Sequence, residues 1–157
     1  MDEAAHDQQK QHDELDWSVR FFVYQFFVEH ERPPTPEETA TALGITLEQA
    51  REVYVSLHRR HALFLEPETL DVHMAHPFSA RPTPFRVHAG GHAYSANCAW
   101  DMLGIPAALH ADAHIEAVYS DSGALALCSV VDGHVHGGGA VSFAVPFRQW
   151  YDDLIFT

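Results

Sequence analysis

The chain has 157 residues, and its 22 acidic against 9 basic residues give a formal net charge of −13. Such a field repels phosphate backbones and anionic membranes, so nucleic acid and membrane partners are disfavoured. A membrane span is also disfavoured, because no apolar run in the sequence approaches the roughly 20 residues that a span needs. The acidic, polar N-terminus does not resemble a signal peptide, and the two cysteines lie far apart, so we expect reduced thiols and a cytoplasmic location.

The first helix is expected after a polar start. Residues 1–15 lack apolar periodicity and predict a disordered lead-in. The strongly apolar segment that comes next predicts a buried helix over about residues 17–30, which the Arg-Pro-Pro sequence at 32–34 ends.

A helix-turn-helix pattern comes next. Thr35 is a good N-cap for a helix over residues 36–43, with proline at its first position. Gly44 ends that helix, and Thr46 caps a further helix from residue 47 to about residue 60. Two capped helices separated by a glycine turn are typical of this motif.

A hairpin is expected behind the two helices, from strands at residues 62–65 and 70–74. It completes a winged-helix-like domain over residues 16–76. DNA binding by a regulator is one interpretation of such a domain, and a packing role is the other. Residues 1–80 carry 15 acidic and 6 basic residues, a net of −9, so we favour the packing role.

A small, mostly antiparallel sheet domain is expected over residues 77–157, which gives the chain an α+β fold. A proline-rich linker opens this segment, and a Gly90-Gly91 turn follows its first strand. The predicted strands cover residues 85–88, 114–119, 124–131 and 140–145.

A short helix that opens on a cysteine is predicted within this second domain. Asn97 is a good N-cap, Gly104 suits the position after the last turn, and Pro106 is a stop signal. These signals predict a helix from Cys98 to Leu103.

The predicted helix brings a thiol and a carboxyl group together. At the first helical position, Cys98 would face unpaired backbone N–H groups and the positive end of the helix dipole, which favour the thiolate. Asp101 follows one turn later on the same face and could hold or deliver a proton. A buried cysteine in the core is the plainer alternative.

Several motifs in order carry a resemblance to a known family. They are PFSARPTPFRV at residues 77–87, NCAWDMLGIPA at 97–107, FAVP at 143–146 and WYDDLIFT at 150–157. Together they resemble the alkylmercury lyase (organomercurial lyase) family. The resemblance implies a helical domain that does not bind DNA, packed on a sheet domain that carries the site.

The resemblance also implies a reaction, protonolysis of a carbon–mercury bond in R–Hg⁺ to give R–H and Hg(II). Cys98 as thiolate would bind the mercury, a soft cation, and Asp101 would relay the proton and contact the metal. No cofactor is implied; the partners are the organomercurial and the low-molecular-weight thiols that remove the product. Trp100 is expected in the pocket wall or, in preference, the core.

One departure from the family pattern concerns a second reactive cysteine, which the resemblance places just after the last motif. The chain stops at Thr157, so we expect weakened cleavage, and one hypothesis is that the next codon is a UGA read as selenocysteine in the natural protein. Cys128 could substitute only if its sulfur lay near Cys98, and its apolar strand predicts burial instead.

Histidines allow a different metal site. His134 and His136 would share one face of an extended segment, and His110 and His114 lie close to the predicted helix in sequence. With Cys98 they could hold copper or zinc, although solvated loop histidines are the simpler interpretation. A noncatalytic thiol and histidine metal-binding protein is therefore the main alternative function, and a winged-helix regulator the lesser one.

Overall fold

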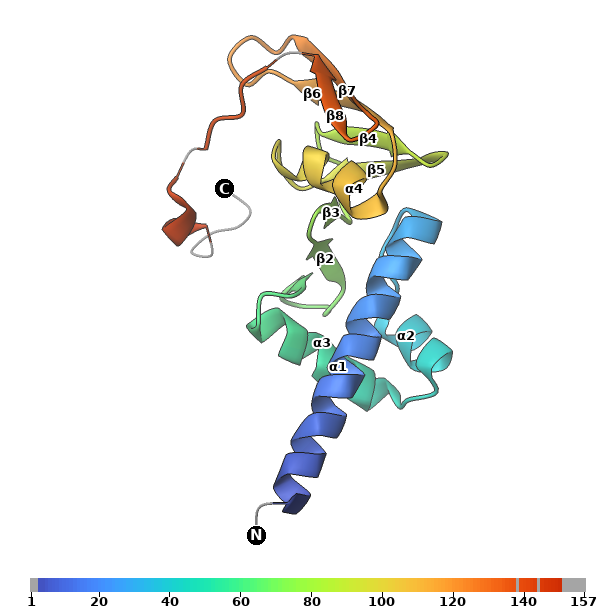
Figure 1. The fold of residues 1–157 in the computed structure, drawn as a ribbon. Coiled ribbons are helices and arrows are strands. Elements are labelled where there is room, and N and C mark those ends of the chain that lie inside the picture. The colour runs from blue at the N-terminus through green and yellow to red at the C-terminus, as the bar shows by residue number, and fades with distance from the viewer. Residues whose placement is uncertain (1–2, 138, 144, 151–157) are drawn as a thin grey trace. The chain divides into compact units, whose positions relative to one another are not determined.

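A computed structural model describes residues 3–137, 139–143 and 145–150 and divides the chain into two units, Met1–Pro82 and Thr83–Thr157. Within the described residues the chain forms four α-helices and eight strands (Figure 1), which confirms the α+β class. The first unit extends past the predicted boundary at residue 76 because β3 (Phe78–Ser79) pairs with β2 (Val72–Ala75) of that unit.

Helix α1 runs from Glu3 to His30, so the prediction of a disordered lead-in is wrong for residues 3–15. Tertiary contacts stabilise this polar half of the helix. Asp16 is almost fully buried and forms an ion pair with Arg60 just after α3, and Asp13 lies 3.8 Å from the same guanidinium. Ion pairs formed across the fold leave no apolar periodicity in the sequence, which is why the pattern missed this part of the helix.

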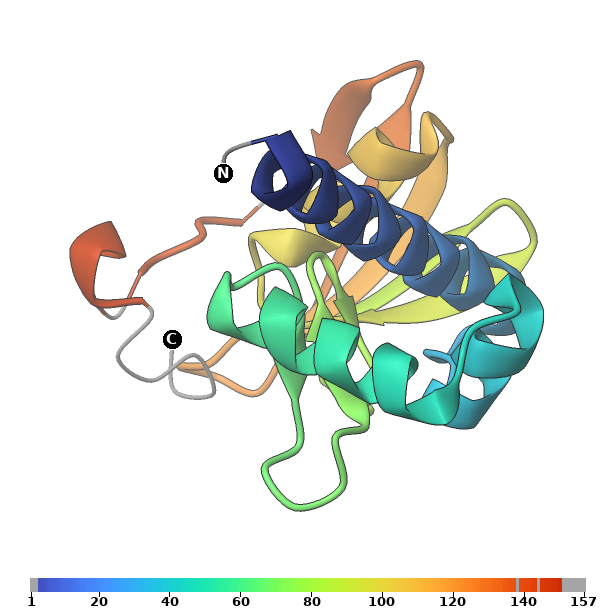
Figure 2. The ribbon, with the colours of Figure 1, turned by 90° about the horizontal axis from the view of Figure 1, so that it is seen from below.

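Helices α2 (Pro36–Leu43) and α3 (Leu47–Arg59) confirm the predicted pair, with Gly44 at φ 65° between them. Each begins at a threonine that exchanges two hydrogen bonds with the third helical residue, Thr35 with Glu38 and Thr46 with Gln49. These capping boxes satisfy N–H groups that a helix start leaves unpaired. Helices α1, α2 and α3 pack on one another (Figure 2).

Tyr54 joins these helices in the core of the first unit. Its ring is fully buried, and its hydroxyl lies 2.7 Å from the hydroxyl of Thr39 and donates to the carbonyl of Pro34 at 3.2 Å. Burial raises the pKa of Tyr54 to about 12, so the phenol stays neutral. A satisfied buried hydroxyl fixes how α3 meets the start of α2.

The hairpin of the first unit is also confirmed. Strands β1 (Phe64–Leu65) and β2 pair antiparallel, and β2 continues into an antiparallel pair with β3. Tyr24 of α1 donates a hydrogen bond to the carbonyl of His76 at 2.8 Å. This contact ties the end of the hairpin to the long helix.

The second unit is an antiparallel sheet in the order β5-β4-β6-β7-β8, with helix α4 (Asp101–Leu109) packed on β4 and β5. A short 3₁₀ helix, Phe147–Gln149, follows the sheet. The strands are β4 (Arg86–Ala89), β5 (His92–Ala96), β6 (Ala113–Val118), β7 (Leu125–Val131) and β8 (His134–Gly137).

Two of these strands were not predicted, and one predicted strand is missing. Strand β5 pairs with β4 across the glycine turn, and β8 pairs with β7 across an Asp132-Gly133 turn with φ of 50° and 74°. Asp-Gly with positive φ at both positions forms a tight hairpin turn. The prediction missed this turn because the histidines and glycines that follow it are not typical strand residues. Residues 140–143 form no strand.

The two faces of the sheet differ in burial. The inner face carries Val87, Ala89, Ala113, Ile115 and Ala117, all less than 9 % exposed, whereas the alternate residues His88, His114 and Glu116 on the outer face are exposed. Helix α4 places the fully buried Ile105 in this unit's core. No helix within residues 3–137, 139–143 and 145–150 has the length and hydropathy to cross a membrane.

We expect Tyr54→Phe to lower the free energy of unfolding by about 1–2 kcal/mol, because the hydroxyl of Thr39 and the carbonyl of Pro34 lose their buried partner. Urea unfolding followed by circular dichroism measures the change. Thr41→Ala is the control, since the hydroxyl of Thr41 bonds to its own helix at the surface and its loss should cost at most about 0.5 kcal/mol. Equal stability of Tyr54→Phe and wild type would contradict this view of the core.

Candidate functional site

The helix near the candidate cysteine begins later than predicted and ends later. Helix α4 starts at Asp101, and Cys98 lies in the bend before it, where its carbonyl accepts a hydrogen bond from the N–H of Met102 at 3.2 Å. The helix also runs past the predicted stop at Pro106, because Ile105 and Pro106 are both buried. Burial of this apolar turn outweighs the local stop signal.

The bend holds the thiol of Cys98 beside the carboxyl group of Asp101. The Sγ of Cys98 donates a hydrogen bond to Oδ2 of Asp101 at 3.5 Å. Both groups come from one short turn, so their separation is set by local backbone geometry. The arrangement can pass a proton between sulfur and carboxylate.

A cavity of about 450 Å³ opens in front of this turn, within the second unit. Cys98 and Cys128 both line it. The wall is largely apolar, and its larger side chains include Phe85, Trp100, Leu103, Val135, Val141 and Phe143. A pocket with this wall would accept an apolar group while presenting sulfur.

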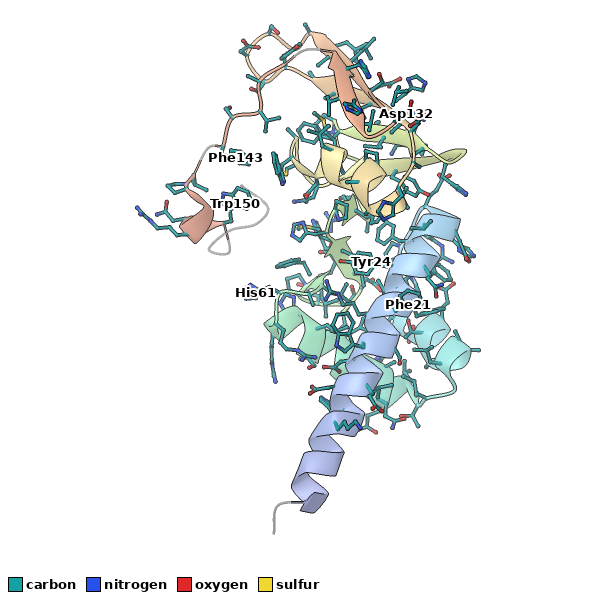
Figure 3. All side chains as sticks on the ribbon, in the orientation of Figure 1. Phe21, Tyr24, His61, Asp132, Phe143 and Trp150 are labelled. Atoms are coloured by element: carbon teal, nitrogen blue, oxygen red, sulfur yellow. The ribbon has the colours of Figure 1, made fainter. Side chains whose placement is uncertain are left out.

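Trp100 belongs to the cavity wall and not to the core. Its side chain is 56 % exposed, and its ring centroid lies 6.0 Å from that of Phe143. The rings of Phe143 and Trp150, both on the segment after β8, stack with their centroids 5.1 Å apart (Figure 3). The preference for a core position was therefore wrong, since Trp100 is more than half exposed and lines the cavity.

The electrostatics of Cys98 differ from the prediction. Burial raises the pKa of the thiol, and the charge of Asp101 and its hydrogen bond to the thiol raise it further. Backbone N–H groups of Asp101 and Trp100 act in the opposite direction without outweighing these effects. The expectation of a favoured thiolate at a helix start is wrong, because the sulfur is half-buried and faces a carboxylate.

Cys128 lies on β7 with a half-buried side chain. The prediction of burial in the core was wrong, since this thiol reaches the cavity. Burial raises its pKa as well.

The candidate histidines lie elsewhere. His134 and His136 occupy alternate positions of β8 and are exposed, His114 lies on the outer face of the sheet, and His110 follows the last turn of α4. None of the four lines the cavity. Across the part of the chain that the structure describes, no group of three or more His, Cys, Asp or Glu side chains could hold a metal ion. The structure does not bring the histidines to Cys98.

The C-terminal motifs are described only in part. Phe143 and Trp150 are described, whereas residues 144 and 151–157 lie outside the described residues.

Comparison with known proteins supports the resemblance seen in the sequence. Residues 78–153 match the family model described as alkylmercury lyase. A solved structure entitled "Crystal structure of the mercury-bound form of MerB2" has a similar fold, with a TM-score of 0.61 and 22% sequence identity over 81% of this chain. The chain spans 65% of that protein's length. No match is found among curated proteins.

We expect Asp101→Asn to increase the alkylation rate of Cys98 by iodoacetamide at neutral pH, because removing the negative charge and the hydrogen-bond acceptor lowers the pKa of the thiol. The rate should be measured against pH in a Cys128→Ser background. The parent's midpoint should lie above that of a free cysteine, about pH 8.5, and Asp101→Asn should move it down. An unchanged midpoint would show that the carboxyl group does not act on the sulfur.

Proposed function

We propose that this chain, whose residues 78–153 match the alkylmercury lyase family, cleaves carbon–mercury bonds in R–Hg⁺ by protonolysis. The observation that carries the proposal is the hydrogen bond to the carboxylate of Asp101 from the thiol of Cys98, which lines a largely apolar cavity. A soft nucleophile, a proton carrier and an apolar pocket each have a role in this reaction.

Binding of the substrate begins at Cys98. Mercury is a soft cation that prefers sulfur to oxygen ligands, so R–Hg⁺ displaces the proton from the thiol. The neighbouring carboxylate of Asp101 accepts that proton at the 3.5 Å contact. The raised pKa of the thiol keeps this proton at the site until mercury arrives.

The same proton then serves in cleavage. Asp101, now a carboxylic acid, protonates the carbon bound to mercury, and the electron pair of the C–Hg bond forms the new C–H bond. R–H leaves, Hg(II) remains on sulfur, and the carboxylate is restored. Low-molecular-weight thiols would then take Hg(II) from the protein by exchange, and no cofactor takes part.

The apolar wall of the cavity suits the organic group of the substrate. Side chains such as Leu103, Val141 and Phe143 surround the space next to the sulfur, and burying an apolar R group against them is favourable. An apolar surrounding also excludes water from the carbon–mercury bond.

The first unit fits a packing role better than DNA binding. Two arginines of the α3 region are already ion-paired, Arg51 with Glu37 at 3.2 Å and Arg60 with Asp16. Ion-paired arginines on an acidic unit supply little attraction for phosphates. We therefore propose that the first unit is winged-helix-like but does not bind nucleic acid. We also propose that the chain works in the reducing cytoplasm.

The test is benzene release from phenylmercury in the presence of excess small thiol. We expect Asp101→Asn to bind phenylmercury about as well as the wild type, since Cys98 is intact, but to release benzene at least about 100-fold more slowly, because an amide has no acidic proton to give. Gas chromatography of the headspace measures benzene, and mass spectrometry measures the adduct.

Asp121→Asn is the matched control, because this carboxyl group is exposed in the turn between β6 and β7, whereas Asp101 is the carboxyl group that accepts the hydrogen bond from Cys98. Its rate should match the wild type. Undiminished release from Asp101→Asn would mean that the proton comes from another group. A wild-type chain that binds phenylmercury without releasing benzene would favour the noncatalytic metal-binding alternative.

A further inference from the structure

We infer that Trp100 and Phe143 form an aromatic subsite for the organic group of R–Hg⁺, which makes the cavity prefer aryl groups over saturated groups of the same size. The inference rests on the proposed function for the class of substrate. It concerns which organic group the cavity selects, whereas Cys98 and Asp101 concern how the carbon–mercury bond breaks.

Two large rings on the wall of the cavity remain open to solvent. Trp100 is 56 % exposed and Phe143 is 50 % exposed, and both line the cavity. By contrast, the ring of Tyr94 in the same unit is almost fully buried. Exposed apolar surface at a cavity is typical of a ligand-binding groove, because a ligand that covers it gains free energy of burial. The two rings are therefore available to a substrate.

Trp100 lies beside the sulfur that would hold the mercury. It follows Cys98 by two residues in the same bend, and its backbone N–H is one of the groups that act to lower the pKa of the thiol. A mercurial bound at Sγ of Cys98 therefore carries its organic group into the space that this indole lines.

The two rings have the geometry of a favourable aromatic pair. Their centroids lie 6.0 Å apart and their planes meet at 58°, within the separation of about 4.5–7 Å that aromatic pairs prefer. Such rings attract one another through the positive edge of one and the negative face of the other. A phenyl group at this pair can make the same kind of contact. A cyclohexyl group of similar size has no π system and gains burial alone.

Trp150 positions Phe143, since residues 140–143 form no strand that would fix the ring. The rings of Phe143 and Trp150 stack with their planes at 26° (Figure 3). The indole N–H of Trp150 donates a hydrogen bond to the carbonyl of Val145 at 3.1 Å, which holds the indole against its own segment. Trp150 thus acts on the subsite through Phe143.

Aliphatic side chains of the same wall cannot supply an aryl preference. Leu103, Val135 and Val141 line the cavity, and they offer a phenyl and a cyclohexyl group similar apolar contact. They limit the size of the organic group, whereas Trp100 and Phe143 distinguish its electronic character.

The experiment compares phenylmercury with cyclohexylmercury on the full chain, by the ratio of their kcat/KM values for hydrocarbon release in excess small thiol. The two carbon–mercury bonds differ in intrinsic reactivity, so the quantity measured is the change of this ratio on substitution. We expect Trp100→Leu and Phe143→Leu each to lower the phenyl-to-cyclohexyl ratio about 2- to 12-fold, the factor that one aromatic contact adds to burial. Trp100→Phe and Phe143→Tyr keep a ring and should retain most of the preference.

The positioning role of Trp150 has its own test. Trp150→Leu should lower the same ratio, because the ring of Phe143 loses its stacking partner. Trp150→Phe should restore the ratio, since a phenyl ring can stack in place of the indole.

A binding measurement separates the subsite from the lyase activity. Asp101→Asn is expected to hold both mercurials uncleaved, so mass spectrometry can follow their partition between the protein and an excess of small monothiol. Adding Phe143→Leu should weaken retention of phenylmercury about 2- to 12-fold and that of cyclohexylmercury less than about twofold. A wild type that releases neither hydrocarbon would refute the lyase, whereas the partition would still test the subsite.

Trp17→Leu is the matched control, because it removes an exposed indole from α1 of the first unit and should leave the ratio unchanged. Trp100 and Phe143 lie on different segments, so if one leucine variant fails to fold by circular dichroism, the other decides. An unchanged ratio in the folded leucine variants, an equal loss for both mercurials, or a larger fall in Phe85→Leu, which removes a half-buried ring of the same wall, would each overturn the inference.

Discussion

The burial of α4 against the sheet of the second unit is the constraint on which the candidate site depends. Ile105 is fully buried, and the helix cannot shift without exposing it, which fixes the bend that precedes the helix. That bend carries Cys98, and the first residue of the helix is Asp101. The apolar contact thus holds in place the turn whose local backbone geometry sets the distance between the sulfur of Cys98 and the carboxylate of Asp101.

Partial burial then changes the acidity of the Cys98 thiol beside Asp101. A fully exposed thiol would titrate near its ordinary pKa, whereas burial and the charge of Asp101 raise the pKa of the half-buried Cys98. A metal that binds sulfur strongly enough can displace this proton, and weaker electrophiles meet an unreactive thiol. The raised pKa of Cys98 thus favours the protonated thiol at the place where the proposed reaction uses the proton.

The two units differ in what their polar groups do. In the first unit, buried polar contacts such as Tyr54 with Thr39 and Arg60 with Asp16 connect helices. In the second unit, the cavity leaves two thiols open to a ligand. The match to the alkylmercury lyase family covers residues 78–153 and so lies almost wholly in the second unit, which also holds the candidate site.

The sequence by itself determined the features that local rules govern: the capped helices at Thr35 and Thr46, the α+β class, and the pairing of Cys98 with Asp101 one turn apart. Only the tertiary structure decided the limits of α1 and α4, since distant ion pairs and burial override local propensity. It alone placed Cys128 on the cavity, because strand register selects the face of a residue and the sequence carries no direct record of that register.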